Sequence, residues 1–434
     1  MTGKMKPSGV AWIGDIPEGW EMSRVKYHYE ISLGKMLQPL PLALTDTLEY
    51  YMCSANITWN GISLTPLKQM WFNASEKAQY KLRKGDLLVT EGGDVAVSCI
   101  WNGEVEDCYL QNAAHRVRQI GAADNRFLYY WLFLCKHTGY IDQICNKATI
   151  AHFTKEKFGE IPLCVMRISE QKAIADFLDV QCAKIDSVIA DIEKQIETLQ
   201  KYKKSMITEA VTKGLDRSVP MKNSGMKNVD DIPQGWSVQR LKYVSRLKTG
   251  TTPAGNEGIN YEGQGIPWFT PSDFVPSLEL KKSEKFVDDE TINREGITPY
   301  PANSVLLVAI GATVGKIGIT KSKGYSNQQI TAIIPTGIDS KYLLYYLFSK
   351  ADYIKDNALY TTLPIINNAY LSNIPVIIPS EQEQKDIAEY LDRRCSLISK
   401  IICDKEKQLK TVQQHKKSLI YEYVTGKKRA TEVN

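Results

Sequence analysis

Two stretches of the chain carry apolar residues at alternating steps of three and four, and each stretch predicts one long helix. The first runs from Glu170 to about Val211, and the second repeats its lattice about 213 positions later. This spacing is typical of a helix that buries one narrow apolar stripe against another helix. The seam residues are Leu178, Ile185, Ile192, Leu199 and Met206 in the first stretch and Leu391, Ile398, Ile402, Leu409, Val412 and Leu419 in the second.

A thin stripe of this kind needs a partner helix. Roughly 40 residues would form a rod about 60 Å long, and the other stretch, with the same lattice, is the nearest partner. An antiparallel coiled coil is the simplest pairing, because the chain must return across a globular segment. Lys203, Lys405 and Lys416 interrupt the stripes. Either these lysines reduce the stability of the helix pair, or they mark places where the helices splay or meet another chain. The alternative is two separate amphipathic helices, each packed on its own domain.

The remaining sequence consists of short apolar runs separated by Gly, Pro and Asn. Asp86–Val89 and Ser304–Val308 read as buried strands that lead into glycines. Helices are expected near 126–137 and 340–351. The fold class is therefore α/β (α+β), with a β-rich mixed core before each long helix.

The chain is an internal repeat, which explains why these patterns occur twice. Residues 5–27 and 221–243 are identical at twelve of twenty-three positions without gaps, and residues 161–212 align without gaps on 374–425. Between them the copies diverge, although Gly34 aligns with Gly250. The predicted organisation is a first domain at 1–160, a helical segment at 161–215, a second domain at 216–373 and a helical segment at 374–434.

Composition excludes several classes of protein. Nine scattered cysteines and five histidines show no metal-ligand spacing, and an odd number of cysteines does not suit a disulfide framework. No phosphate loop, methyltransferase motif or nucleophile elbow occurs, so we expect no catalytic site and no metal. No apolar run is long enough for a membrane span and no signal-peptide core is present, so the expected location is the cytoplasm. A net charge of +5 permits nucleic-acid binding without demonstrating it.

The repeated motifs resemble the specificity subunit of type I restriction-modification enzymes. The motif Ile-Pro-x-Gly-Trp ends at Trp20 and again at Trp236, and Glu-Gln-x-x-Ile-Ala-x-(Phe/Tyr)-Leu-Asp opens each long helix, at Glu170–Asp179 and Glu383–Asp392. Either motif alone is weak, whereas both, twice and in this order, are specific. In the second opening, Asn228-Val229-Asp230 replaces the Trp-Ile-Gly of the first.

The resemblance implies two target-recognition domains that each read one half of a split double-stranded DNA sequence. The paired helices would fix the gap and dock two modification subunits, with restriction subunits joining the complex. S-adenosylmethionine, Mg²⁺ and ATP would then belong to the partner subunits and not to this chain. Because the two variable segments differ, the target should be asymmetric.

Base reading needs amides, hydroxyls and arginines on loops, and phosphate binding needs lysine or arginine. The candidates are polar residues of the variable segments that align between the copies but differ in type. They are Lys35, Gln38, Gln111, Asn112, His115, Arg116, Lys147 and Thr149 in the first copy, and Lys248, Thr249, Thr251, Thr252, Lys316, Asn327, Gln328, Gln329, Thr361 and Thr362 in the second.

Blander explanations remain for these residues and for the chain. Polar loop residues are often only solvated, or bond to nearby backbone. Trp20 and Trp236, with Arg24 and Arg240, are identical in both copies and are better explained as structural anchors. The chain could also be a stand-alone DNA-binding protein, or a scaffold whose paired helices bind other proteins.

Overall fold

The computed structural model of the protein describes residues 4–145, 152–226, 229–253, 258–263, 265–275, 277–360 and 363–430. The chain divides into two compact units. Unit 1 comprises Met1–Asp191 with Leu409–Asn434, and unit 2 comprises Ile192–Gln408. Within the described ranges, no helix is both long and apolar enough to span a membrane.

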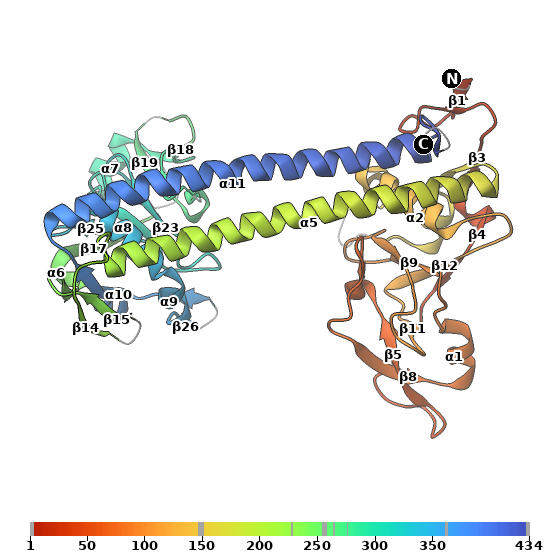
Figure 1. Cartoon of the computed structure of the whole chain (residues 1–434), viewed down its shortest axis with the longest axis horizontal. Coiled ribbons are helices and arrows are strands. Elements are labelled where there is room, and N and C mark those ends of the chain that lie inside the picture. Colours follow the sequence, from red (N-terminus) through yellow and green to blue (C-terminus); the bar gives the residue numbers. More distant parts are fainter. Residues whose placement is uncertain are drawn as a thin grey trace. The chain divides into compact units, whose positions relative to one another are not determined.

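Unit 1 contains two larger sheets and a helix that packs on one of them (Figure 1). The first sheet is antiparallel in the order β10-β9-β12-β4, and the second has the order β11-β5-β8. The strands of the first are β4 (Tyr29–Leu33), β9 (Leu87–Thr90), β10 (Ser98–Ile100) and β12 (Ala114–Gln119), and those of the second are β5 (Thr47–Met52), β8 (Lys68–Phe72) and β11 (Tyr109–Leu110).

The first sheet of unit 1 is buried on both faces. Leu87 and Val89 join the apolar cluster of helix α2 (Asn125–His137), whereas Leu88 joins Met52 and Leu110 of the second sheet. Successive strand residues point to opposite faces, so a helix covers one face and a sheet the other. This burial explains why the run at 87–89 is continuously apolar instead of alternating.

Unit 2 repeats this plan. Its larger sheet has the order β17-β25-β22-β23-β20, and its second sheet β18-β21-β19-β24. Val305 and Leu307 pack with helix α8 (Ser340–Ser349), while Leu306 packs with Phe269 of the second sheet. The strands are β17 (Ser245–Thr249), β18 (Ile259–Asn260), β19 (Ile266–Phe269), β20 (Glu279–Leu280), β21 (Phe286–Val287), β22 (Val305–Val308), β23 (Ile317–Thr320), β24 (Tyr325–Ser326) and β25 (Ile330–Pro335).

Short elements complete each unit. Those of unit 1 are the strand pairs β1 (Met5–Pro7) with β2 (Asp15–Pro17), β3 (Glu21–Arg24) with β13 (Pro162–Val165), and β6 (Ile57–Thr58) with β7 (Gly61–Ile62), and the helices α1 (Ala74–Tyr80), α3 (Tyr140–Ile144) and α4 (Lys155–Gly159). Those of unit 2 are β14 (Met221–Met226) with β15 (Val229–Pro233), β16 (Ser237–Arg240) with β28 (Pro375–Ile378), β26 (Leu359–Tyr360) with β27 (Pro364–Ile365), and α6 (Leu241–Val244), α7 (Asp289–Glu295), α9 (Ala351–Asp356) and α10 (Asn368–Ser372).

The two predicted long helices are α5 (Ile168–Lys213) and α11 (Glu381–Val424), and each unit holds part of both. In unit 1 the rings of Phe177 and Tyr423 stack with centroids 4.3 Å apart, and Lys416 Nζ lies 2.6 and 2.7 Å from the carboxylate oxygens of Asp186. From Phe177 to Asp186 the residue numbers rise along α5, while those of their partners on α11 fall from Tyr423 to Lys416. The two segments are therefore antiparallel.

One seam lysine in each unit, Lys416 in unit 1 and Lys203 in unit 2, is bonded across the helix pair, whereas Lys405 is half-buried. In unit 2 Lys203 Nζ donates to Ser399 Oγ at 2.9 Å, and these two residues align with Lys416 and Asp186 of unit 1. Lys203 and Lys416 are buried, so neither marks a segment where the helices splay. Every predicted seam residue is buried or half-buried. The core of each unit also includes the C-terminal end of the helix that belongs to the other repeat.

Candidate nucleic-acid interface

The two motifs that the repeats share bond to each other in each unit. Trp20 Nε1 donates to Glu170 Oε1 at 3.1 Å, and Trp236 Nε1 donates to Glu383 Oε1 at 3.0 Å. Both indoles are buried. The tryptophan of the opening therefore fixes the start of the following long helix, as expected of a structural anchor.

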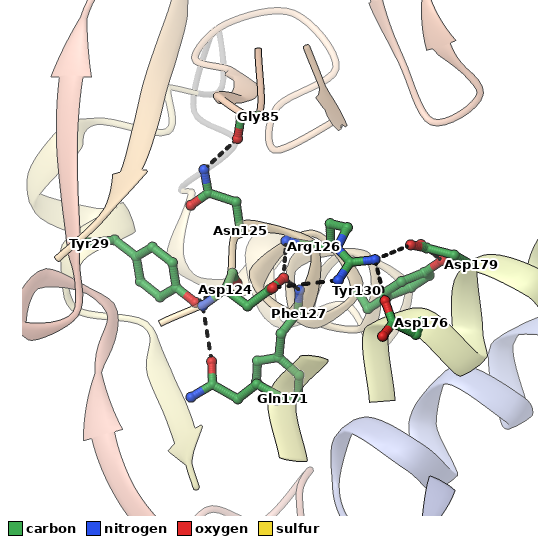
Figure 2. A network of polar contacts seen from close by, with 10 residues as sticks. All are labelled: Tyr29, Gly85, Asp124, Asn125, Arg126, Phe127, Tyr130, Gln171, Asp176 and Asp179. Atoms are coloured by element: carbon green, nitrogen blue, oxygen red, sulfur yellow. Dashed lines mark hydrogen bonds and ion pairs between the residues drawn. The ribbon is translucent and has the colours of Figure 1, made fainter. Parts of the chain in front are cut away.

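The rest of the Glu-Gln motif fastens α5 to α2, the helix that packs on the larger sheet of unit 1 (Figure 2). In unit 1 Gln171 Oε1 accepts from the backbone N–H of Asp124, whose carboxylate caps α2, and Arg126 bridges Asp176 and Asp179 at 2.7 and 2.8 Å. Tyr130 donates its hydroxyl to Asp179 at 2.7 Å. These bonds explain why the motif contains Gln and ends in Asp.

Unit 2 contains the same bonds with one change of cation. Gln384 Oε1 accepts from the backbone N–H of Asp339 at 2.8 Å, and Tyr345 donates to Asp392 at 2.7 Å. Lys341, in the place of the unit 1 arginine, pairs with Asp392. We call the Trp–Glu, Gln–Asp and Tyr–Asp contacts of each unit the frame.

Away from the frame, the polar loops of each unit meet at one edge of the larger sheet. In unit 1 the backbone N–H of Gly34 donates to Ala114 O at 3.2 Å, that of Glu91 to Ala113 O at 2.9 Å, and that of Phe153 to Glu91 O at 2.8 Å. In unit 2 the corresponding donors and acceptors are Gly250 to Ile330 (2.9 Å), Ala309 to Gln329 (2.7 Å) and Ile366 to Ala309 (2.8 Å). We call segments 34–38, 91–92, 111–113 and 152–155 the loop edge of unit 1, and segments 249–252, 309–313, 326–329 and 365–368 the loop edge of unit 2.

A glycine lies at the closest approach of the backbones in each loop edge. A Cβ on Gly34 would lie 2.4 Å from the carbonyl carbon and oxygen of Gln111, and one on Gly250 would lie 2.1 Å from Asn327 O. Only a residue without a Cβ fits at these contacts. The shared glycine of the alignment therefore has the same role in both units.

Two of the three amides predicted in unit 1 bond to each other on its loop edge. Gln111 and Asn112 are half-buried, and Gln111 Nε2 donates to Asn112 Oδ1 at 2.6 Å. Gln38, also half-buried, accepts from Lys35 Nζ at 2.6 Å and donates to Asp46 at 3.3 Å. The amides of Gln111 and Asn112 are thus oriented and within reach of a ligand.

Three other predicted contacts of unit 1 are buried. Lys35 pairs with Glu76 as well as Gln38, His115 Nε2 lies 2.7 Å from Phe153 O, and Arg116 donates to Gln79 O at 2.7 Å. Burial lowers the pKa of His115 and of Arg116. These side chains support the sheet from inside and would contact a ligand only after rearrangement.

Six of the predicted residues of unit 2 lie on its loop edge, whereas Lys248 and Lys316 lie outside the segments that define it. Thr252 donates its hydroxyl to Gln328, Asn327 Nδ2 donates to Gln329 Oε1 at 2.9 Å, and Lys248 donates to Thr298 O. Burial lowers the pKa of Lys248. The exposed members of the set are Thr249, Thr251, Lys316 and Gln328. Lys147, Thr149, Thr361 and Thr362 lie outside the described residues.

The sequence did not single out Asn368 or Lys155. Asn368 is exposed, donates to Thr249 Oγ1 at 2.8 Å and accepts from Thr331 Oγ1 at 3.1 Å, so it belongs to the loop edge of unit 2. Lys155 aligns with it and is exposed at the start of α4. The sequence did contain a signal for them. Lys155 and Asn368 are polar residues of different type at aligned positions, and each directly follows a residue that caps a helix, Thr154 or Asn367.

A second surface that the sequence did not reveal is an exposed apolar loop that begins in segment 34–38 of the loop edge of unit 1 and continues to Asp46. Asp46 orders this loop by accepting from the backbone N–H groups of Leu42 and Ala43 at 2.8 and 3.2 Å. Backbone bonding to Leu42, together with Ala43, Gln38 and Lys35, lowers the pKa of Asp46 although burial opposes the shift. Its exposed side chains are Met36, Leu37, Leu40, Leu42 and Leu44.

No cluster of three or more potential metal ligands occurs within the described parts of the chain. The candidate site is therefore a pair of polar loop edges on equivalent sheets, with an apolar loop beside one of them. Such a surface has the donors and acceptors for base edges and some of the cations for phosphates.

Comparisons with known proteins agree with this architecture. The chain is 27% identical over 447 residues to a protein of Methanocaldococcus jannaschii described as a putative type I restriction enzyme MjaX specificity subunit, covering 96% of this chain and 95% of that protein. It is also 27% identical to the MjaVIII specificity subunit of the same organism, over 72% of each chain.

A solved structure shares the fold. It is described as showing complex assembly and conformational transition of the type I R-M system, and it superposes with a TM-score of 0.69 at 15% identity, over 94% of this chain and 98% of that one. The family model for the type I restriction modification DNA specificity domain matches residues 17–198 and again 233–411. The chain therefore belongs to the family of type I restriction-modification DNA specificity domains and contains that domain twice.

Proposed function

We propose that this chain is the DNA-recognition subunit of a type I restriction-modification complex, acting in the cytoplasm without catalysis of its own. The observation that carries the proposal is that two units with the same frame present loop edges of different composition. Each loop edge would read one half of a bipartite target. Because the two loop edges differ, the two half-sequences would differ as well.

The chemistry of the loop edges supports base reading. A carboxamide can donate and accept at once, and so can bond in pairs to adenine edges in the major groove. Gln111 and Asn112 in unit 1 and Asn327, Gln328 and Gln329 in unit 2 offer such groups. Lys155 and Lys316 are exposed cations for phosphates, and the apolar loop of unit 1 would contact thymine methyl groups.

The helix pair would set the gap between the half-sequences and dock two modification subunits, with restriction subunits completing the complex. S-adenosylmethionine, Mg²⁺ and ATP would be bound by those partners. In support, the seam of each unit is closed by buried contacts, which suits a rigid spacer.

Selection from random duplexes tests the proposal. The chain with its modification subunits should enrich a split sequence with a fixed gap, whereas a protein-binding scaffold would enrich none.

Exchange of residues 28–150 for another reader should change one half-sequence only. Deletion of one heptad within 178–210 should change the gap or abolish assembly, and should leave both half-sequences unchanged. Enrichment of an unsplit sequence by the chain alone would favour a stand-alone DNA-binding protein.

A further inference from the structure

The apolar loop of unit 1 has no explanation in the stability of its own unit. Leu42 is 86% exposed and Leu44 is fully exposed, so neither contributes to a core. Met36, Leu37 and Leu40 are exposed as well. A contiguous run of exposed apolar side chains commonly marks a surface that binds another molecule.

The loop is held in one shape although its side chains are exposed. The buried Lys35 donates to Gln38 Oε1 at 2.6 Å, and Gln38 Nε2 donates to Asp46 Oδ2 at 3.3 Å. The backbone N–H of Trp71, on β8, donates to Gln38 O at 3.1 Å. The apolar side chains are therefore presented by an ordered loop, which reduces the conformational entropy that is lost when they bind.

The loop is unsuited to contact with phosphates. No lysine or arginine occurs from Met36 to Asp46. Pro39 and Pro41 have no backbone N–H, and Asp46 already accepts from two more of the backbone N–H groups. Because phosphates are bound by cations and by free N–H or O–H donors, a DNA contact of this loop must be with the bases.

The loop leaves the larger sheet beside the amides of unit 1. The backbone N–H of Lys35 donates to Leu110 O at 2.9 Å, and that of Asn112 donates to Lys35 O at 2.8 Å. Met36 follows directly in the chain. A duplex that bonds to Gln111 and Asn112 therefore lies against the start of the loop.

We propose that Leu42 and Leu44, the two most exposed side chains of the loop, insert between two stacked base pairs of the half-sequence that unit 1 reads and open that step. This inference rests on the proposed function. The faces of stacked bases are the main apolar surface inside a duplex, and leucine, methionine and proline are among the residues that proteins insert between them.

An opened step would add specificity at a position where no amide bonds to a base. The cost of unstacking depends on the sequence and is smallest at flexible pyrimidine–purine steps. The step would open in one half only, because the sequence after Gly250, Thr-Thr-Pro-Ala-Gly-Asn-Glu-Gly, contains no leucine.

Fluorescence of 2-aminopurine tests the proposal, because this base brightens when its stacking is lost. It is placed in turn at positions of both halves of the enriched duplex, which is bound by the chain with its modification subunits. The expected result is a rise beside one step of the half that unit 1 reads. The double variant Leu42→Ser, Leu44→Ser should lose this rise and bind about tenfold more weakly. A base drawn out by a modification subunit would stay bright in that variant.

Ile120→Ser is the matched control, because this side chain is 51% exposed at the opposite end of β12 from the loop edge. This control should change neither the fluorescence nor the affinity. Leu42→Met should retain both the rise and the affinity, since methionine also opens base steps. Hydrogen exchange of unit 1 would establish that each variant is folded.

Absence of a rise at every position of the half that unit 1 reads overturns the proposal and leaves reading by the amides intact. Replacement of thymine by uracil would then show whether the leucines contact methyl groups instead. If the double variant binds DNA as before but no longer retains the modification subunits in gel filtration, the loop is a protein-docking surface and the proposal is overturned. Failure of the unaltered chain to enrich any split sequence overturns the proposed function as well.

Discussion

Replacement of Gly250 by alanine should remove recognition of one half-sequence and leave the other intact. The added Cβ would lie 2.1 Å from Asn327 O and 2.4 Å from Ser326 O, both backbone atoms. Because ordinary contacts of a Cβ begin near 3.4 Å, segment 326–329 must move by more than 1 Å from β17. The amides of Asn327 and Gln328 would move with it.

The magnitude follows from the bonds that this movement breaks. The backbone N–H of Gly250 donates to Ile330 O at 2.9 Å, and that of Thr251 donates to Ser326 O at 2.8 Å. Two backbone hydrogen bonds contribute about 2 kcal/mol to the stability of unit 2. A displaced amide that no longer reaches its base would cost about 1–3 kcal/mol of discrimination, or roughly 5- to 150-fold in affinity ratio.

The assay compares duplexes that are altered in one half-sequence at a time. Gly250→Ala should no longer distinguish the unaltered duplex from one altered in the half that unit 2 reads. It should still reject a duplex altered in the half that unit 1 reads. Gly34→Ala should give the mirror-image result. The controls are Gly19→Ala and Gly235→Ala, since a Cβ at either of these aligned positions would meet no atom within 4 Å. Circular dichroism and hydrogen exchange would establish that each variant is folded.

Two outcomes would refute the reasoning. If a folded Gly250→Ala chain discriminates as the unaltered chain does at both halves, the loop edge does not read DNA. If discrimination falls equally at both halves, the units do not read independently.

Four further predictions concern charge and apolar contact. Lys316→Ala should weaken binding to all duplexes alike and lower the slope of log affinity against log salt by about one, measured from 50 to 200 mM salt. Leu42→Ser, at a side chain 86% exposed, should leave stability within about 0.5 kcal/mol and weaken only the half that unit 1 reads, measured with the same duplexes. Asp186→Ser should destabilise unit 1 by about 1–2 kcal/mol, because buried Lys416 keeps only a hydroxyl, and Ser399→Asp should stabilise unit 2, both measured by hydrogen exchange of the helix amides. Burial lowers the pKa of Lys203 below its ordinary value of 10.5, so the folded chain loses this proton at a lower pH than the unfolded chain does. Unit 2 should therefore gain stability as the pH rises towards 10. Lys203→Met should remove that gain, measured by urea unfolding at several pH values.

Local periodicity was sufficient for the long elements. The heptad pattern over 170–211 lies within α5, and the expected helices near 126–137 and 340–351 correspond to α2 and to α8 with the start of α9. Each pattern depends on side chains that share one face, which sequence spacing reports directly. The pairing of the seam could be inferred for the same reason.

The placement of His115 and Arg116 could not be predicted from spacing. Both lie on β12, a central strand buried on both faces, where polar and apolar residues need not alternate. Their acceptors are the carbonyls of Phe153 and Gln79, each more than 35 residues away. The residues next to His115 and Arg116 in the sequence give no sign of these distant carbonyls. The local sequence around such a buried polar residue therefore looks like that around a polar residue on a loop. The apolar loop was missed for the opposite reason, because an uncharged apolar run reads as core unless its surroundings are known.

The distribution of side-chain bonds gives a physical reason for the division of the repeat into similar ends and divergent middles. Every contact of the frame needs a particular side chain: Trp20 bonds to Glu170, Tyr130 bonds to Asp179, and Gln171 accepts from the backbone of Asp124. Loss of such a side chain leaves its polar partner unsatisfied. At the loop edges the bonds that recur in both units join backbone to backbone, and the recurring side-chain requirement is the absence of a Cβ at Gly34 and Gly250. Backbone bonds do not depend on side-chain identity. The loop edges can therefore exchange one set of amides for another without loss of the fold, and this freedom is what a reader of variable sequence requires.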